Sequence, residues 1–236
     1  MLNKFWLDGV CSLDVGIQLQ SAIIFGQPTP RVTVTTVSGR SGDLTEWDGS
    51  YSNISASAKC FALNVDRVSD GFSTISAFLR GGTLGYRRLE TEEEPDVYRM
   101  ARVTNFPETE IRANRLAPFS LSWDCKPQKY LKVGETAFEV KSGETLYNPT
   151  QFAALPLLEL TLTGDAKLQI GDVPMSIAGY TGKMLIDCEL QDAYRDGANL
   201  NRYLTAPEFP QLARETRVSW TGGISSLLVT PRWWTI

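Results

Sequence analysis

The chain has 236 residues, of which 42% are hydrophobic, enough to build one large β domain or two ordinary domains. Its formal net charge is -4 and its acidic and basic residues are mixed, which argues against the basic stripe that grips nucleic acid. No stretch approaches the roughly 18 consecutive apolar residues of a membrane span. The 19 glycines and 12 prolines are scattered, which is typical of many short strands joined by turns.

The first 63 residues carry mostly strand signals. The amino terminus, Met1 to Trp6, carries one lysine, and the chain then turns polar at Asp8, so we expect no signal peptide. Residues 31–35 alternate apolar and polar side chains and predict a half-buried strand, and the glycine-containing residues 38–43 predict a turn. Residues 51–63 predict one or two further strands, with apolar or small side chains at alternate positions.

One helix is predicted, over Ser69 to Arg80. Ser69 or Asp70 can cap its free amide groups, and Gly81-Gly82 suits its end. Four apolar residues fall on one face at helical spacing: Phe72, Ile75, Phe78 and Leu79.

The next segments are an acidic run and two strands. The run from Glu90 to Asp96 contains Pro95 and predicts a solvated loop rather than a metal or substrate site. Residues 98–103 and 119–125 alternate like strands of an antiparallel sheet.

The composition changes near residues 127–130, and this predicts two domains, 1–131 and 132–236. Beyond the boundary the sequence predicts strands at 158–162 and 184–190, a hairpin over 168–177 around Gly171-Asp172, and a second hairpin over 218–230 around residues 221–223. The pattern is typical of a second β-sandwich with almost no helix. The predicted fold class is therefore mainly β, with one α-helix in the first domain.

The residues offer little for catalysis, and we expect no enzyme, cofactor or metal. Histidine, the commonest general base, is absent, and so are the motifs of esterases and phosphate-binding loops. The pairs Glu108/Glu110 and Asp187/Glu189 are interpreted as solvent-facing charges on strands rather than a glycosidase pair. The cysteines lie far apart, and the interpretation is buried core thiols: Cys11, Cys60, Cys125 and Cys188.

The six tryptophans raise the question of sugar stacking. Trp123 and Trp220 are in register with apolar neighbours and are predicted to pack in the core. Trp233 and Trp234 are consecutive, so one of them is a candidate for an exposed partner surface.

Taken together, these segments resemble the distal tail protein family of long-tailed phages and prophages of Gram-positive hosts. The order and spacing of the matching stretches carry the resemblance: Phe5 to Leu19, Val37 to Leu44 with Tyr51, Leu79 to Gly82, Phe119 to Tyr130, Asn148 to Pro156, Ile186 to Glu189 with Tyr194, Phe209 to Leu212 and Val229 to Arg232.

The resemblance implies an amino-terminal β-sandwich that assembles into a hexameric ring, and a galectin-like second sandwich. The ring is expected at the virion's tail tip after assembly in the host cytoplasm. It would join the tail tube protein to the tail-associated fibre or lysin protein, and in some phages to receptor-binding proteins. DNA would pass through without specific binding, and no membrane is involved. Sugar-binding galectins use a histidine that this chain lacks, so the second domain is interpreted as an assembly platform.

We predict that the segment from Arg40 to Tyr51, with Arg40, Asp43 and Tyr51 as candidate contacts, forms part of a ring contact or lines the channel. An ordinary surface hairpin is the alternative for this segment. For the whole chain the alternatives are a carbohydrate-binding module, a tail tube or capsid decoration protein and, last, a hydrolytic tail enzyme.

Overall fold

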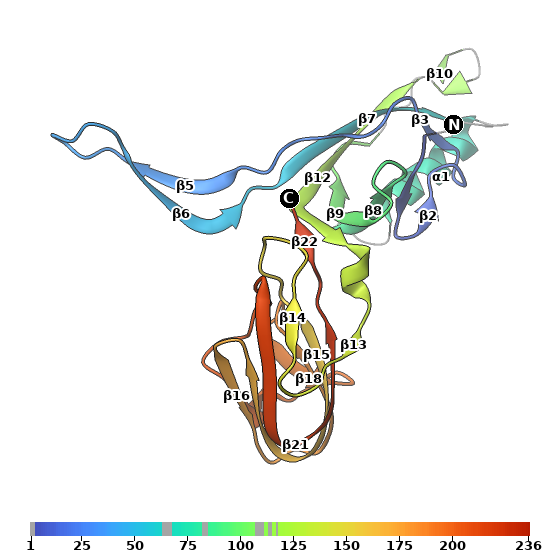
Figure 1. Ribbon diagram of the computed structural model, residues 1–236. Helices are drawn as coiled ribbons and strands as arrows, with labels where there is room; N and C mark the ends of the chain where they lie inside the picture. The colour runs from blue at the N-terminus through green and yellow to red at the C-terminus, as the bar shows by residue number, and fades with distance from the viewer. Residues whose placement is uncertain (1–2, 63–67, 82–84, 107–110, 113–114, 117) are drawn as a thin grey trace. The chain divides into compact units, whose positions relative to one another are not determined.

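The computed structural model describes residues 3–62, 68–81, 85–106, 111–112, 115–116 and 118–236 (Figure 1). The chain divides into two compact units, Met1–Lys129 with Ile236 and Tyr130–Thr235. Strands dominate both units, and α1 (Val68–Arg80) is the one α-helix in the described part of the chain. The prediction of a mainly β fold with one helix in the first half is confirmed.

The first unit is built on one antiparallel sheet with the strand order β2-β1-β8-β9-β12-β7-β3, in which β4 also pairs with β7. A separate two-stranded sheet pairs β5 with β6, and another pairs β10 with β11. The strand bounds are β1 Phe5–Leu7, β2 Val10–Cys11, β3 Ile17–Leu19, β4 Ile24–Phe25, β5 Pro30–Thr35, β6 Leu44–Tyr51, β7 Ile54–Ala62, β8 Arg87–Thr91, β9 Val97–Val103, β10 Ile111–Arg112, β11 Arg115–Leu116 and β12 Phe119–Leu131.

The central pair β7 and β12 shows why this sheet has one apolar face. Along β7, alternate residues from Ile54 to Cys60 are buried, while the residues between them are exposed. On β12, Leu121, Trp123 and Cys125 lie opposite Ala58, Ala56 and Ile54, so both strands present their apolar side chains to the same face. This alternation confirms the strand predictions at 51–63 and 119–125, except that Leu63 lies outside the described residues.

Helix α1 contributes to the core of this sheet. Ile75 and Leu79 are buried in the same apolar cluster as the sheet residues, and Phe78 packs against that cluster. The helix ends at Arg80, and Gly81 follows with φ +56°, a conformation that glycine adopts without strain. The predicted helix is confirmed; the expected caps Ser69 and Asp70 and the expected Gly82 lie outside the residues whose side chains are described.

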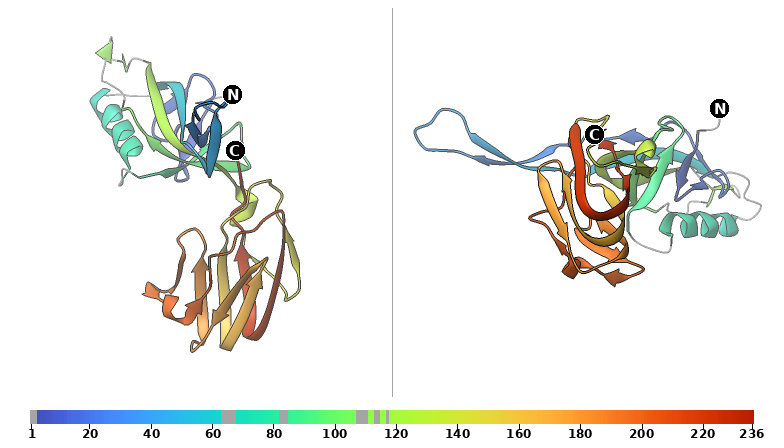
Figure 2. Two further views of the ribbon diagram at one scale, coloured as in Figure 1. Left: turned by 90° about the vertical axis from the view of Figure 1, so that its left-hand side faces the viewer. Right: turned by 60° about the horizontal axis from the view of Figure 1, so that its bottom comes forward.

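The second unit is a curled antiparallel sheet with the order β13-β21-β15-β17-β18-β19 (Figure 2). Strand β14 also pairs with β21, and β16 pairs with both β15 and β20. The bounds are η1 Lys132–Glu135, β13 Phe138–Glu139, β14 Thr145–Tyr147, β15 Leu157–Ile170, β16 Val173–Ile177, β17 Gly182–Asp187, β18 Asp192–Arg195, β19 Ala198–Asn199, η2 Asn201–Tyr203, β20 Leu204–Thr205, β21 Glu215–Thr230 and β22 Trp234–Thr235.

The alternating leucines of β15 form the centre of the second core. Leu158, Leu160 and Leu162 are all buried, as predicted, and they lie opposite residues of both β17 and β21. The predicted hairpin over 168–177 is also confirmed, because Ile170 pairs with Val173 across a turn in which Gly171 has φ +55°.

The predicted hairpin over 218–230 is wrong, because these residues form one continuous strand, β21. The register between β15 and β21 shifts near Leu162 and Ala166, so β15 bulges there. Gly222 and Gly223 lie against this bulge with no room for a side chain, and Gly222 has φ +88°. The glycines thus let β21 pass close to the bulge of β15 instead of reversing the chain.

The predicted strand 184–190 is shorter than expected, because β17 ends at Asp187. The Asp187 carboxylate accepts hydrogen bonds from the backbone amides of Glu189 and Leu190, at 3.0 and 3.1 Å, which turns the chain. Leu190, the last residue of the predicted strand, is therefore 69% exposed, while Cys188 is buried as predicted.

We expect Gly223→Ala to lower the free energy of unfolding by about 1–3 kcal/mol, because its new Cβ would lie 2.5–2.8 Å from the backbone of Gly164. Gly164→Ala is the matched control, since a Cβ there has nothing within 4 Å and its cost stays within about 0.5 kcal/mol. Urea unfolding of the two variants measures the difference. Equal effects would contradict the steric account of this crossing.

Candidate functional site

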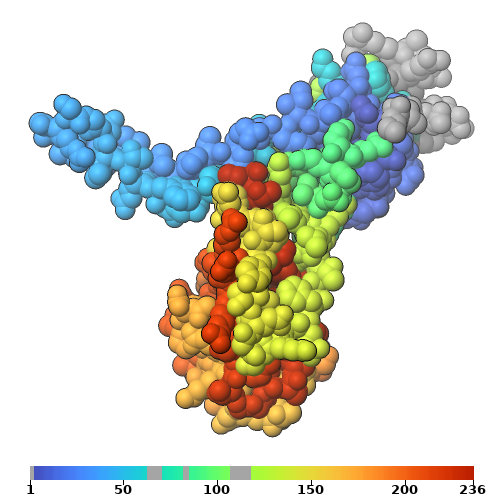
Figure 3. Space-filling model, viewed as in Figure 1, coloured from blue at the N-terminus to red at the C-terminus, as the bar shows by residue number. Residues whose placement is uncertain are grey.

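The hairpin of β5 and β6 is the most exposed part of the first unit. It forms its own two-stranded sheet, and Figure 1 and Figure 3 show it projecting away from the rest of that unit. The strand predicted at 31–35 exists, but the prediction that it is half-buried is wrong: every residue of β5 is exposed. No second layer covers the hairpin within the described part of the first unit, so its alternating pattern has no core to face.

Apolar side chains lie on both faces of this hairpin. Val32 lies opposite Trp47, and Val34 lies opposite Thr45, so these four residues share one face. Val32, Val34 and Trp47 are 48%, 56% and 52% exposed. Leu44, on the other face with Glu46, is 48% exposed. This concentration of exposed apolar side chains is unusual for a surface that meets only water.

The three predicted contact residues all belong to the hairpin but do not form one cluster. Arg40 lies in the exposed tip. Asp43 accepts a hydrogen bond from the Thr36 hydroxyl at 3.0 Å, at the start of β6. Tyr51 lies at the other end of β6, half-buried, with its ring edge-on to Trp47 at 5.6 Å. Eight residues of strand separate Asp43 from Tyr51 by about 26 Å, so one compact site cannot contain both.

The predicted turn at 38–43 is confirmed as the hairpin tip, where Gly39 and Gly42 have φ +80° and +82°. Glycine adopts this left-handed conformation without the steric penalty that other residues incur.

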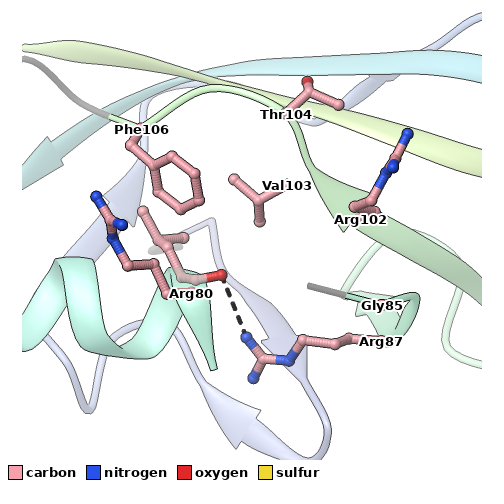
Figure 4. Close-up of a pocket in the computed structure, with 8 residues that line it drawn as sticks. Arg80, Gly85, Arg87, Arg102, Val103, Thr104 and Phe106 are labelled. Carbon is pink, nitrogen blue, oxygen red and sulfur yellow. Dashed lines mark hydrogen bonds between the residues drawn. The ribbon is translucent and has the colours of Figure 1, made fainter. Parts of the chain in front are cut away.

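A pocket of about 330 Å³ lies between the last turn of α1 and the end of β9 (Figure 4). It is lined by Leu79, Arg80, Gly85, Arg87, Arg102, Val103, Thr104 and Phe106. Apolar side chains and three arginines therefore meet in one hollow. Sequence patterns missed this pocket because its residues come from two segments that no motif connects.

The three arginines of the pocket differ in how they are paired. Arg87 donates to Asp8 and to the backbone oxygen of Phe78, both at 2.6 Å. Arg102 donates to Asp124 at 2.9 Å. Arg80 lies 4.6 Å from the centre of the Phe106 ring. Among the described residues, no carboxylate pairs with Arg80, whereas Arg87 and Arg102 each have one.

The acidic run at 90–96 was predicted to be a solvated loop. This prediction is incomplete, because Glu94 within the run belongs to an ion-pair network. Glu94 accepts from Arg99 at 2.6 Å and from Lys129 at 3.2 Å. The Arg99 side chain is only 4% exposed and stacks on the Phe25 ring at 3.9 Å. Partial burial alone would raise the pKa of Glu94, but these two cations lower it below 4.5. Glu90 belongs to β8 and pairs with Arg88.

Asp187 also contradicts its prediction, because it is buried rather than solvent-facing. Its two oxygens accept from the Arg232 guanidinium at 2.7 and 2.8 Å, a paired arrangement that is stronger than a single bond. Burial would raise the pKa of Asp187, but Arg232 and the amides of Glu189 and Leu190 lower it below 3.8. This carboxylate therefore serves structure, and Glu108 and Glu110 lie outside the described residues.

We expect Asp187→Asn to lower the free energy of unfolding at pH 7 by about 1–3 kcal/mol, because it removes a charged pair from a buried position. Since the folded pKa lies below the unfolded one, the wild-type advantage is complete above about pH 4 and fades as the pH falls through the folded pKa. Urea unfolding at pH 7 and pH 3 measures this. Glu189→Gln is the control, because Glu189 lies 3.6 Å from Arg232 and its side chain is 43% exposed. An advantage that is unchanged at pH 3 would contradict the assignment.

The cysteines and tryptophans mainly serve packing. Burial raises the pKa of Cys60, Cys125 and Cys188 to about 12, so these thiols stay protonated at neutral pH, and Cys11 is half-buried.

In the described part of the chain, no group of three or more acidic or cysteine residues is placed to hold a metal ion. No helix in that part is long and apolar enough to cross a membrane.

The tryptophans offer few surfaces for a sugar. Trp123 is buried and Trp220 packs against the second core, as predicted. Neither consecutive tryptophan is exposed: Trp233 is buried, and Trp234 stacks on Phe152 at 4.6 Å. Of the six tryptophans, Trp47 in the hairpin is the one classed as exposed.

Comparisons with known proteins place this fold. No protein-family model matches the chain, and no curated protein matches it by sequence. Among solved structures it is similar to the Dit protein of phage SPP1, described as a paradigm of the hub adsorption apparatus in phages that infect Gram-positive bacteria. The similarity covers 100% of both chains, with a TM-score of 0.75 and 14% identity. Two structures of the phage P2 baseplate in its activated conformation, with Ca and with Sr, cover 97% of this chain at TM-scores of 0.49 and 0.47 and identities of 12% and 10%. The chain therefore has the fold that the resemblance to distal tail proteins implies.

Proposed function

We propose that this chain is a structural subunit of a phage tail tip, a distal tail protein that assembles into a hexameric ring. The ring would join the tail tube to the tail-associated fibre or receptor-binding machinery in the virion, after assembly in the host cytoplasm. The observation that carries the proposal is the likeness in fold to SPP1 Dit over the full length of both chains. The matching motifs along the sequence support the same assignment.

The hairpin of β5 and β6 supports self-assembly on physical grounds. A two-stranded hairpin alone is marginally stable in water, and this one exposes apolar side chains on both faces. A partner that covers those side chains would bury them and stabilise the hairpin. The eight residues of β6 span about 26 Å of extended chain, enough to contact a neighbouring subunit. A ring needs such a projecting surface together with a complementary one.

The proposal assigns a scaffolding role rather than a reaction. The candidate catalytic carboxylate Asp187 is bound by Arg232, and three of the four thiols are protonated at neutral pH because burial raises their pKa. The second unit is proposed as the assembly platform. Its tryptophans pack inward: Trp233 is buried, and Trp220 and Trp234 pack half-buried against the second core.

The proposal is tested by the solution mass of the purified protein and by negative-stain images. We expect a discrete particle of six or twelve times the 26.2 kDa chain mass, with a central hole. Light scattering measures the mass, and class averages show the symmetry. A monomer that binds cell-wall glycan would instead support the carbohydrate-binding module.

We further expect combined alanine substitutions at Arg40, Asp43 and Tyr51 to weaken assembly at least tenfold, because both ends of β6 would lose their side-chain contacts. Sedimentation across a concentration series measures the change. An intact oligomer would show that these residues are an ordinary surface hairpin.

The matched control carries alanine at Arg214, Asp172 and Tyr147, three residues of the same types that are exposed on the second unit. It should assemble like the wild type. Equal weakening of both triple variants would indicate a general loss of stability, which thermal unfolding of the two proteins would reveal.

A further inference from the structure

We propose that the arginine-lined pocket beside α1 is the receptor for the hairpin of a second copy of this chain. In this contact Leu44 of one copy would enter the pocket of the next, and Glu46 would pair with Arg80. The inference rests on the proposed self-assembly and adds to it the acceptor surface and the pairing residues.

The chemistry of the pocket defines what it can bind. Leu79, Val103 and Phe106 give it an apolar lining, while Arg80 and Arg102 carry charge at its exposed parts (Figure 4). Arg87 and Arg102 are already paired with carboxylates of their own chain, whereas Arg80 has none among the described residues. The best ligand is therefore an apolar side chain that is flanked by a carboxylate.

The hairpin presents this combination at the start of β6. Leu44 is 48% exposed and is flanked by Asp43 and, two residues on, by Glu46. Glu46 is exposed, and no cation in the described part of the chain pairs with it. Leu44 and Glu46 are two residues apart on one strand, so their side chains point to the same face. One face of β6 thus matches both the apolar lining of the pocket and Arg80, which has no carboxylate partner in the part of the chain that the structure describes.

The size of the pocket allows the contact. An engineered cavity of about 150 Å³ holds a benzene ring, so a pocket of about 330 Å³ accommodates a leucine side chain. An ion pair at its rim would lie partly out of water, where charges interact more strongly than at an open surface.

The arrangement within the first unit makes this a contact between copies. The hairpin and helix α1 lie at opposite ends of the unit in both Figure 1 and the right-hand view of Figure 2. The hairpin therefore projects away from the helix whose last turn lines the pocket. The hairpin and the pocket are therefore two different surfaces of the same unit, and a contact between two different complementary surfaces is head-to-tail, which closes into a ring when the rotation between copies allows it.

The test is a charge exchange between two exposed residues. Glu46→Arg places a second cation against Arg80, and Arg80→Glu places a second anion against Glu46. Each single variant should weaken self-association at least tenfold, measured by sedimentation. Mixing the two variants at equal concentration should restore association to within about threefold of wild type, because each hairpin then meets a pocket of opposite charge. The double variant Glu46→Arg/Arg80→Glu should also associate with itself.

Controls and outcomes separate this inference from the proposed function. Glu208→Arg and Arg214→Glu, exposed on the second unit, should associate like the wild type. If the wild-type protein is oligomeric and the two single variants associate as strongly as it does, the docking inference is overturned, while the proposed ring is not. Weakened single variants that mixing does not rescue would overturn the pairing of Glu46 with Arg80. A wild-type protein that stays monomeric at every concentration would overturn self-assembly and the docking inference together.

Discussion

The constraint on which the rest of the structure depends is that each unit closes its apolar core without residues 30–51. Strands β7 and β12 bury their alternate residues with α1, and β15 and β21 bury theirs in the second unit. Because these cores form without it, the hairpin of β5 and β6 is covered by no layer among the described residues of its own unit. Its exposed valines, leucine and tryptophan then require another explanation, and the proposed contact with a neighbouring subunit would provide one.

Ion pairs hold in place the segments that follow the strands, where side chains no longer alternate between buried and exposed. Arg232 ties the region after β21 to Asp187 at the end of β17, and Arg99, which stacks on the ring of Phe25, holds Glu94. Both carboxylates have a lowered pKa because of the cations beside them, so they are charged at neutral pH. Asp187, one member of a carboxylate pair considered for catalysis in the sequence, is thus a structural anchor. On the exposed hairpin and in the arginine-lined pocket, Glu46 and Arg80 have no ion-pair partner among the described residues.

The likeness to SPP1 Dit and the local geometry support the role in different ways. The full-length match identifies the architecture, since 14% identity over the whole of both chains carries information about fold. The hairpin and the pocket are features of this chain's own residues, and they supply the physical reason why copies would associate. A scaffold built this way needs two complementary surfaces rather than a catalytic centre.

The sequence by itself determined the elements whose signals are local. Alternation placed β7, β12 and β15, helical spacing placed α1, and glycines placed the turn at Gly171 and the tip at Gly39 and Gly42. Only the tertiary structure decided whether an alternating strand has a core to face, as β5 does not. It alone decided that Gly222 and Gly223 accommodate the bulge of β15 instead of forming a turn, and that Asp187 meets Arg232 from 45 residues away. The physical reason is that burial, close approach and ion pairing depend on neighbours distant in the chain, which local periodicity does not record.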